Sequence, residues 1–290
     1  MNSRTFARVL TLLSAAAAAH AAGTFTIGGP VGTLTPASGS YSWDGSNMTA
    51  YRTALANTSN FGPSGTVTTS INQVVLSTIT AGTLVGVNAF VSPWWDVADS
   101  ASFHSTLVTY FLGGGSLILL DDASGKDGIA AALGLPTVGG LGGPWTAASS
   151  MLTGPFGNPG SVITAGQIGF LSPANISSHN GTVCGTNGSG NPTAVCIAPG
   201  VYAPGAGALI IVADIDTWST QATYSPLNGN GRWALNGTAF IVTGGVASSP
   251  APAPSASGVP SLGEWGMVIL AAVLIGFGSL MASRRSPNRA

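Results

Sequence analysis

Charged residues are scarce in this 290-residue sequence and make up only 6% of it. Lysine and glutamate each occur once, as Lys126 and Glu264, and there are only two cysteines and three histidines. A nucleic-acid partner would require a basic face, which so few basic residues cannot supply. Two cysteines without a histidine or a further cysteine at ligand spacing also make a poor zinc site. The sequence therefore argues against both a nucleic-acid partner and structural zinc.

The few charges are unevenly distributed along the chain. Residues 22–258 contain eight aspartates but only three basic residues, so this part carries a charge of about −5 at neutral pH. The other basic residues lie near the two ends of the chain. Glycine supplies 42 residues, and serine, threonine and asparagine are frequent. A surface solvated mainly by hydroxyls and amides is consistent with an exported protein.

The first 21 residues have the organisation of a secretory signal peptide. Arg4 and Arg8 precede an apolar run over 9–19, and Ala19-His20-Ala21 is a small-x-small cleavage site. The alternative is a retained N-terminal anchor, which is disfavoured because the alanine-rich run is only weakly hydrophobic. We therefore expect a signal peptide over 1–21 and a mature chain that begins near Ala22.

A second apolar segment lies near the C-terminus. No charged residue occurs between Trp265 and Ser283. Nineteen residues at about 1.5 Å each span about 28 Å, close to the hydrocarbon thickness of a bilayer. Three arginines follow within 284–290, and the positive-inside rule places this basic end in the cytoplasm. The pattern predicts one transmembrane helix over 265–283, with everything before Glu264 outside.

Eight residues, VPSLGEWG at 259–266, lead into this helix. They resemble the IPTL-CTERM sorting signal of Gram-negative bacteria. The matching positions are Pro260, Leu262, Glu264, Trp265 and Gly266, and the conservative departures are Val259 and Ser261. The resemblance implies an exosortase-type membrane transpeptidase as partner, which cuts near the motif and releases or re-attaches the ectodomain at the cell surface. The alternative is an ordinary single-pass anchor.

Residues 22–244 are long enough for one sizeable domain. Strands are expected over 24–27, 84–91, 116–120 and 207–213, and helices over 48–57, 99–112, 128–133 and 230–240. The alternation of strand and helix predicts an α/β fold with a parallel sheet. Short strands and loops are expected over 136–205. A Pro/Ala/Ser linker over 245–258 would act as a semi-rigid spacer before the sorting tail over 259–290.

Three segments of this domain, 110–119, 205–214 and 230–236, resemble the class I glutamine amidotransferase-like fold. This resemblance implies a flavodoxin-like, mostly parallel sheet with flanking helices. The catalytic residues of the family are not matched, because neither cysteine follows a strand on a sharp turn between glycines. The resemblance therefore concerns the fold and not an amidotransferase activity.

Cys184 and Cys196 are the ends of a polar segment, CGTNGSGNPTAVC. An oxidising compartment would join them, and a disulfide across such a segment stabilises a fold by about 3 kcal/mol. The alternative is two free thiols. We expect the disulfide.

Four aspartates end two of the predicted strands, namely Asp121, Asp122, Asp214 and Asp216. If the strands are neighbours, the four carboxylates converge where ligands bind in open α/β sheets, and oxygen ligands of this kind suit Ca²⁺. The alternative, which the residue types favour, is that the aspartates cap the following turns. Trp94 and Trp95 follow another strand at the same predicted edge, where they would contact a sugar or simply pack.

The sequence thus predicts an inner-membrane, single-pass precursor whose ectodomain reaches the periplasm and then the cell surface. The leading hypothesis for the ectodomain is a non-enzymatic binding or structural module that contacts extracellular polysaccharide. The alternative is a hydrolase acting on an envelope glycan or ester through the strand-end aspartates or Ser124. Ser124 lacks the glycine two residues before it that completes a nucleophile elbow.

Overall fold

The computed structural model describes residues 23–95, 97–142, 145–147, 152–160, 162–164, 167–219 and 228–245. The predicted signal peptide, the linker beyond 245 and the sorting tail with its helix lie outside these residues. Within them, no helix is long and apolar enough to cross a membrane. The chain divides into two compact units, Met1–Pro250 and Ala251–Ala290, and the fold described below belongs to the first.

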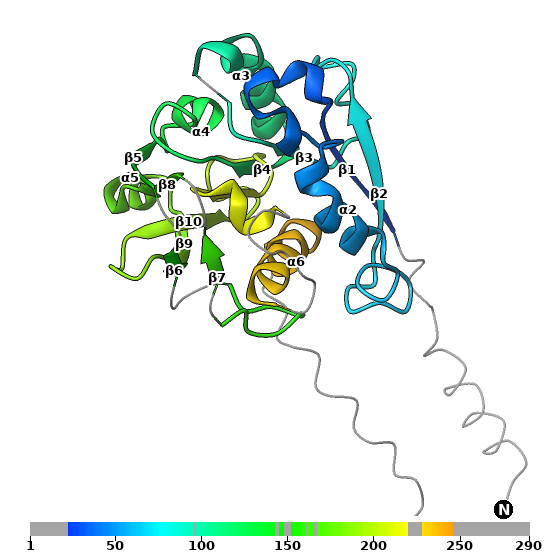
Figure 1. Cartoon of the computed structure of the whole chain (residues 1–290). Coiled ribbons are helices and arrows are strands. Elements are labelled where there is room, and N and C mark those ends of the chain that lie inside the picture. Colours follow the sequence, from blue (N-terminus) through cyan, green and yellow to red (C-terminus); the bar gives the residue numbers. More distant parts are fainter. Residues whose placement is uncertain are drawn as a thin grey trace, which may run out of the picture. The chain divides into compact units, whose positions relative to one another are not determined.

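Seven strands form one sheet in the order β2-β1-β3-β4-β11-β10-β9 (Figure 1). Their bounds are β1 Thr24–Pro30, β2 Ser70–Leu76, β3 Ala89–Ser92, β4 Ser116–Leu120, β9 Thr182–Thr186, β10 Pro192–Ile197 and β11 Leu209–Val212. The five strands from β2 to β11 run parallel, whereas β10 runs antiparallel to both β11 and β9. The predicted α/β fold with a mostly parallel sheet and flanking helices is confirmed.

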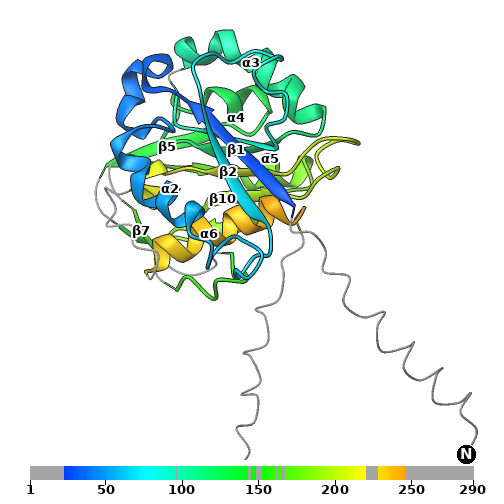
Figure 2. The same cartoon turned by 90° about the vertical axis from the view of Figure 1, so that its right-hand side faces the viewer.

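Helices cover both faces of this sheet (Figure 2). They are α2 Thr49–Ala56, α3 Val97–Leu112, α4 Gly128–Ala132, α5 Pro173–Ser178 and α6 Gly229–Val242. One core forms between the sheet and α2 with α6, and the other between the sheet and α3 with α4. Alternate residues of β4 enter the two cores, Ile118 on the first side and Leu117 on the second. Because both faces are covered, the central strands β3, β4 and β11 are mainly apolar.

Short elements connect and extend this framework. They are the 3₁₀ helices η1 Gly32–Leu34, η2 Pro36–Tyr41, η3 Ser46–Met48 and η4 Ile215–Trp218, and the strands β5 Thr137–Gly142, β6 Trp145–Ala147, β7 Val162–Thr164 and β8 Gln167–Leu171. β5 pairs with β8 and β6 with β7, both antiparallel. The region 136–205 contains short strands as expected, together with the short helix α5.

Two parts of the sheet differ from the prediction. The third strand starts at Ala89 and not at Leu84, because a series of turns precedes it in which Gly86 adopts a φ of +79° and Val85 is 82% exposed. β2 was not predicted. As an edge strand it mixes polar and apolar residues on both faces, so its sequence lacks the alternation that marks a half-buried strand.

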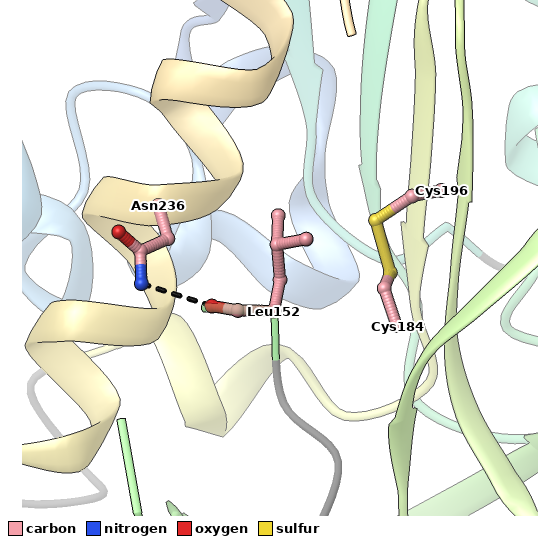
Figure 3. Close-up of a disulfide and its surroundings, with 4 residues drawn as sticks. All are labelled: Leu152, Cys184, Cys196 and Asn236. Atoms are coloured by element: carbon pink, nitrogen blue, oxygen red, sulfur yellow. Dashed lines mark hydrogen bonds between the residues drawn. A yellow bond between two sulfur atoms is a disulfide. The ribbon is translucent and has the colours of Figure 1, made fainter. Parts of the chain in front are cut away.

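Cys184 and Cys196 form the predicted disulfide, which joins the neighbouring strands β9 and β10 (Figure 3). Their Cα atoms lie 5.8 Å apart and both residues are buried. The polar segment between them is a hairpin formed by β9, β10 and a turn. Its turn is held by Asn187, whose side chain accepts from the backbone N–H groups of Ser189 and Asn191.

Asn236 connects α6 to the neighbouring segment 152–160. Its Nδ2 donates to the carbonyl of Leu152 at 2.9 Å (Figure 3). The same Nδ2 donates to the carbonyl of Gly157 at 2.8 Å, and Oδ1 accepts from the N–H of Phe156 at 3.0 Å. The N–H of Leu152 in turn donates to the carbonyl of Cys184. This buried amide therefore links α6 to the disulfide-bonded edge of the sheet.

Gly207→Ala should destabilise the fold by about 1–3 kcal/mol through overpacking. A Cβ at this position would lie 2.2 Å from the carbonyl oxygen of Gly115, a backbone atom just before β4 that cannot move aside alone. Gly82→Ala is the matched control, since its Cβ would approach nothing closer than 3.8 Å. Urea unfolding of both variants measures the effect, and equal stabilities would contradict the close approach of β4 and β11.

Replacing both cysteines, Cys184→Ala with Cys196→Ala, should lower the free energy of unfolding by about 3 kcal/mol, because the unfolded chain regains the freedom that the cross-link removes. Reduction of the wild-type protein should produce a shift of the same size. Thermal melts with and without reductant measure it. A reductant-dependent shift that persists in the double variant would mean that the effect does not come from this disulfide.

Candidate functional site

The parallel strands end at one edge of the sheet, and the four predicted aspartates follow two of these strands. β4 and β11 are neighbours with Leu120 opposite Val212. The pairing continues beyond both strands, because the N–H of Asp121 donates to the carbonyl of Val212 and the N–H of Ile215 donates to the carbonyl of Asp121, both at 2.8 Å. The condition that the sequence analysis left open, that the two strands are neighbours, is therefore met in the structure.

A polar cluster, here called the carboxyl-edge cluster, lies at this edge. It consists of Tyr41, Asp122, Lys126, Asp216 and Ser219. Lys126 Nζ lies 2.9 Å from Asp122 Oδ2, and Tyr41 Oη donates to Asp216 Oδ1 at 2.7 Å. Ser219 Oγ donates to the same Asp216 oxygen at 3.0 Å. Both aspartates are buried, whereas Lys126 and Tyr41 are partly exposed.

Burial governs the protonation of this cluster. It raises the pKa of Asp122, against the opposing effect of the hydrogen bond and charge of Lys126. Burial also raises the pKa of Asp216, against the hydrogen bonds from Tyr41 and Ser219. The pKa of the Tyr41 hydroxyl is raised by its own burial and then by its bond to Asp216. Tyr41 therefore remains a neutral donor at neutral pH.

Asp121 and Asp214 lie beside the cluster but have other surroundings. Asp121 is 3% exposed, and its Oδ2 has no hydrogen-bond partner among the described residues. Burial raises the pKa of Asp121 well above its ordinary value, and the nearby carboxylates of Asp127 and Asp122 raise it further. Asp214 Oδ1 accepts from the N–H of Asp216 at 2.9 Å and so caps η4, as the capping alternative predicted.

The predicted calcium site has no matching set of ligands in the part of the chain that the structure describes. No group of three or more His, Cys, Asp or Glu side chains there is arranged to hold a metal ion. The four aspartates share an edge, but one is a cap, one is enclosed and two are bound to Lys126 and to Tyr41.

The two tryptophans have different roles. Trp95 is buried against Phe103, with ring centroids 5.1 Å apart, and its Nε1 donates to Ser92 Oγ, so it is a packing residue. Trp94 is partly exposed, and Lys126 Nζ lies 4.3 Å from its ring centroid, within cation–π range. Only Trp94 thus belongs with the carboxyl-edge cluster.

Tyr41 and Lys126 are the site residues that the sequence did not predict. Tyr41 lies at this edge because the connection that follows β1 crosses the ends of two other strands. At the end of β3, Ser38 Oγ donates to the Trp94 carbonyl. At the end of β11, Tyr41 itself donates to Asp216. No local pattern indicates this path. The pairing of Lys126 with Asp122 was predictable from the sequence, since Lys126 is the single lysine and follows Asp122 by four residues.

Ser124 does not have the surroundings of a nucleophile. It is exposed, and its side chain makes no hydrogen bond to a described residue, a histidine included. His179 is engaged elsewhere, with Nδ1 2.8 Å from the Asn175 carbonyl and its ring stacked on Tyr202. Both cysteines are in the disulfide, so neither offers a thiolate.

No family model and no curated protein matches this chain. Among solved structures, it is similar to the mmIFT52 N-terminal domain, with 13% identity over 77% of this chain and 99% of that chain and a TM-score of 0.47. The exo-β-1,4-mannosidase Op5Man5 from Opitutaceae bacterium strain TAV5 has 13% identity over 79% of this chain and 37% of that chain, with a TM-score of 0.42. Cytoplasmic protein STM1381 from Salmonella typhimurium LT2 has 14% identity over 53% of this chain and 78% of that chain, with a TM-score of 0.37. Nothing about function follows from similarities this distant.

Asp121→Asn should flatten the pH dependence of stability and raise stability at pH 7. Because the folded-state pKa of Asp121 is raised, the folded protein binds the proton more tightly. The stabilisation that protonated Asp121 gives the fold is fully present below the unfolded-state pKa of about 4. This stabilisation is lost as pH rises, by up to about 1.4 kcal/mol per pH unit. Urea unfolding between pH 4 and 8 measures the slope.

Asp122 and Asp216 titrate in the same direction, so part of the slope should remain in the Asp121→Asn variant. An unchanged slope would mean that Asp121 is ionised in the folded protein. That result would require a partner for its buried oxygen.

Proposed function

We propose that this chain is an exported bacterial cell-surface protein whose α/β domain is a non-enzymatic binding module for extracellular polysaccharide. In this proposal the tail over 259–290 is an IPTL-CTERM-like sorting signal and 265–283 is its transmembrane helix. An exosortase-type transpeptidase is the processing partner. The domain itself would be a flavodoxin-like, amidotransferase-like fold without the catalytic residues of that family.

The disulfide is the observation that carries the proposal of export. Disulfides form and persist in oxidising compartments such as the periplasm and the cell surface, and are rare in the cytosol of mesophiles. Cys184 and Cys196 are bonded in the folded domain and both are 4% exposed. A protein made for the reducing cytosol would have little use for this cross-link.

The strand order supports the finer description of the fold. The five parallel strands follow the order β2-β1-β3-β4-β11, which is the 2-1-3-4-5 order of flavodoxin-like sheets. β10 and β9 extend that sheet on one side as an antiparallel edge. In folds of this order, ligands bind beyond the carboxyl ends of the strands, which is where the carboxyl-edge cluster lies.

The positions where the described domain begins and ends support a tethered module. β1 starts at Thr24 on the amino edge of the sheet, and α6 returns the chain to that same edge. At its end, a Cβ on Gly245 would lie 2.6 Å from Ala198, just beyond the end of β10. The carboxyl-edge cluster is at the opposite edge of the sheet from Gly245.

The surroundings of Ser124 and of the cysteines support binding over hydrolysis. A hydrolase needs an activated nucleophile, but Ser124 contacts no base among the described residues, and both cysteines are joined in the disulfide. The carboxyl-edge cluster instead offers fixed donors and acceptors beside the partly exposed Trp94. Such groups suit the hydroxyls of a sugar chain.

Intact-mass spectrometry of the protein from cells with and without an exosortase-type enzyme tests this proposal. The expected product begins near Ala22, ends near the VPSLGEWG motif only when the enzyme is present, and is lighter by two hydrogens because of the disulfide. Pro260→Ala in the motif should prevent processing, whereas Pro254→Ala in the spacer should not. A chain that still ends at Ala290 in both strains would refute the sorting proposal.

A further inference from the structure

Arg52, on α2, is a cation without a partner among the described residues. The two other basic side chains there are engaged, Lys126 with Asp122 at 2.9 Å and Arg232 Nη1 with the Asn158 carbonyl at 3.4 Å. The guanidinium of Arg52 has neither an ion pair nor a hydrogen bond to a described residue, and its Nε is buried without an acceptor.

The Nε of Arg52 is enclosed and is not itself reached from outside the domain. The residue is partly exposed and has no ion pair with a described residue, so a group that enters from outside would accept from its Nη groups. The group should be an anion, because a guanidinium has donors only and forms its strongest bonds with planar carboxylates and with phosphates. The unpaired guanidinium therefore indicates the chemical nature of the group that would contact it.

The surroundings of Arg52 define the rest of the site. A cavity of about 320 Å³ lies between α2 and β2, and its lining consists of Thr49, Arg52, Thr53, Ala56 and Gln73. No acidic residue lines this cavity. Gln73 Nε2 donates to the Arg52 carbonyl at 2.8 Å, which fixes the amide across the gap between β2 and α2 and leaves its Oε1 as an acceptor.

We propose that this α2–β2 cavity binds the carboxylate of an acidic sugar unit, a uronate, within a polysaccharide. The guanidinium would hold the carboxylate, and the hydroxyls of Thr49 and Thr53 with the Gln73 amide oxygen would bond the sugar hydroxyls. The volume lies at the lower end for ligand sites and suits a single sugar unit. This inference rests on the proposed function and names its ligand class.

Charge makes the inference specific. The domain carries about −5, so long-range attraction does not draw a polyanion to it. Binding of an acidic polymer then depends on a local cation that is not neutralised by the protein. Arg52 meets this condition and, unlike the exposed Arg232, lines a cavity in which no acidic residue is found among the described residues.

Isothermal titration calorimetry of the purified full-length chain in a nonionic detergent tests the inference. The probes are a galacturonate oligosaccharide, the galactose oligosaccharide without carboxylates, and inorganic phosphate. We expect only the galacturonate oligosaccharide to bind. Arg52→Gln should weaken its binding at least tenfold, since a charged hydrogen-bonded pair contributes about 1.4 kcal/mol or more. Arg52→Lys, which keeps the charge without the planar fork, should bind with intermediate affinity.

Arg232→Gln is the matched control, because it removes the same charge from an exposed arginine and should leave binding unchanged. Equal loss in both glutamine variants, equal binding of phosphate, or no binding of galacturonate would each overturn the inference. A melting temperature of Arg52→Gln no lower than that of the wild type would exclude misfolding. The calorimetry uses purified protein, so a failure to bind galacturonate would not affect the conclusion on sorting from mass spectrometry. Likewise, a failure of processing in cells would not affect the calorimetric result.

Discussion

The pairing of β4 with β11 is the constraint on which the rest of the structure depends. Both strands are fully buried, and their side chains fill the cores on both faces of the sheet. The backbones approach so closely at Gly115 and Gly207 that a single Cβ cannot be accommodated there. Because the two strands also end together, the segments that follow them emerge at one edge, and the aspartates in those segments are brought together by the sheet itself.

The sequence predicts the centre of this sheet better than its edges. β4 and β11 are short apolar runs closed by aspartates, and buried parallel strands have this composition because both of their faces are covered. β2 is paired on one side only and contains Asn72 and Gln73, so it carries no such pattern. β9 and β10 depend on the disulfide and on a tight turn, and the cysteines alone indicate the contact but not the hairpin.

The candidate site was predictable to the extent that it follows from strand ends. The apolar runs that precede Asp121 and Asp214 predict the two strands, but that the strands are neighbours comes from the sheet order in the structure. The partner of Asp216 is Tyr41, which is 175 residues away in the sequence and arrives through an irregular connection. Such a contact depends on the path of a loop, and the residue pattern does not determine that path. The unpaired state of Arg52 is likewise a property of the folded surroundings and not of the sequence.

The shortage of charge explains why the two polar regions of this domain favour different ligands. At the carboxyl edge, burial raises the pKa values of Asp121, Asp122 and Asp216, and the one lysine offsets part of the remaining charge. That edge is therefore a set of hydrogen-bonding groups with an acidic balance, which suits uncharged hydroxyls and repels anions. The α2–β2 cavity has the opposite balance, since it contains a cation and no acid.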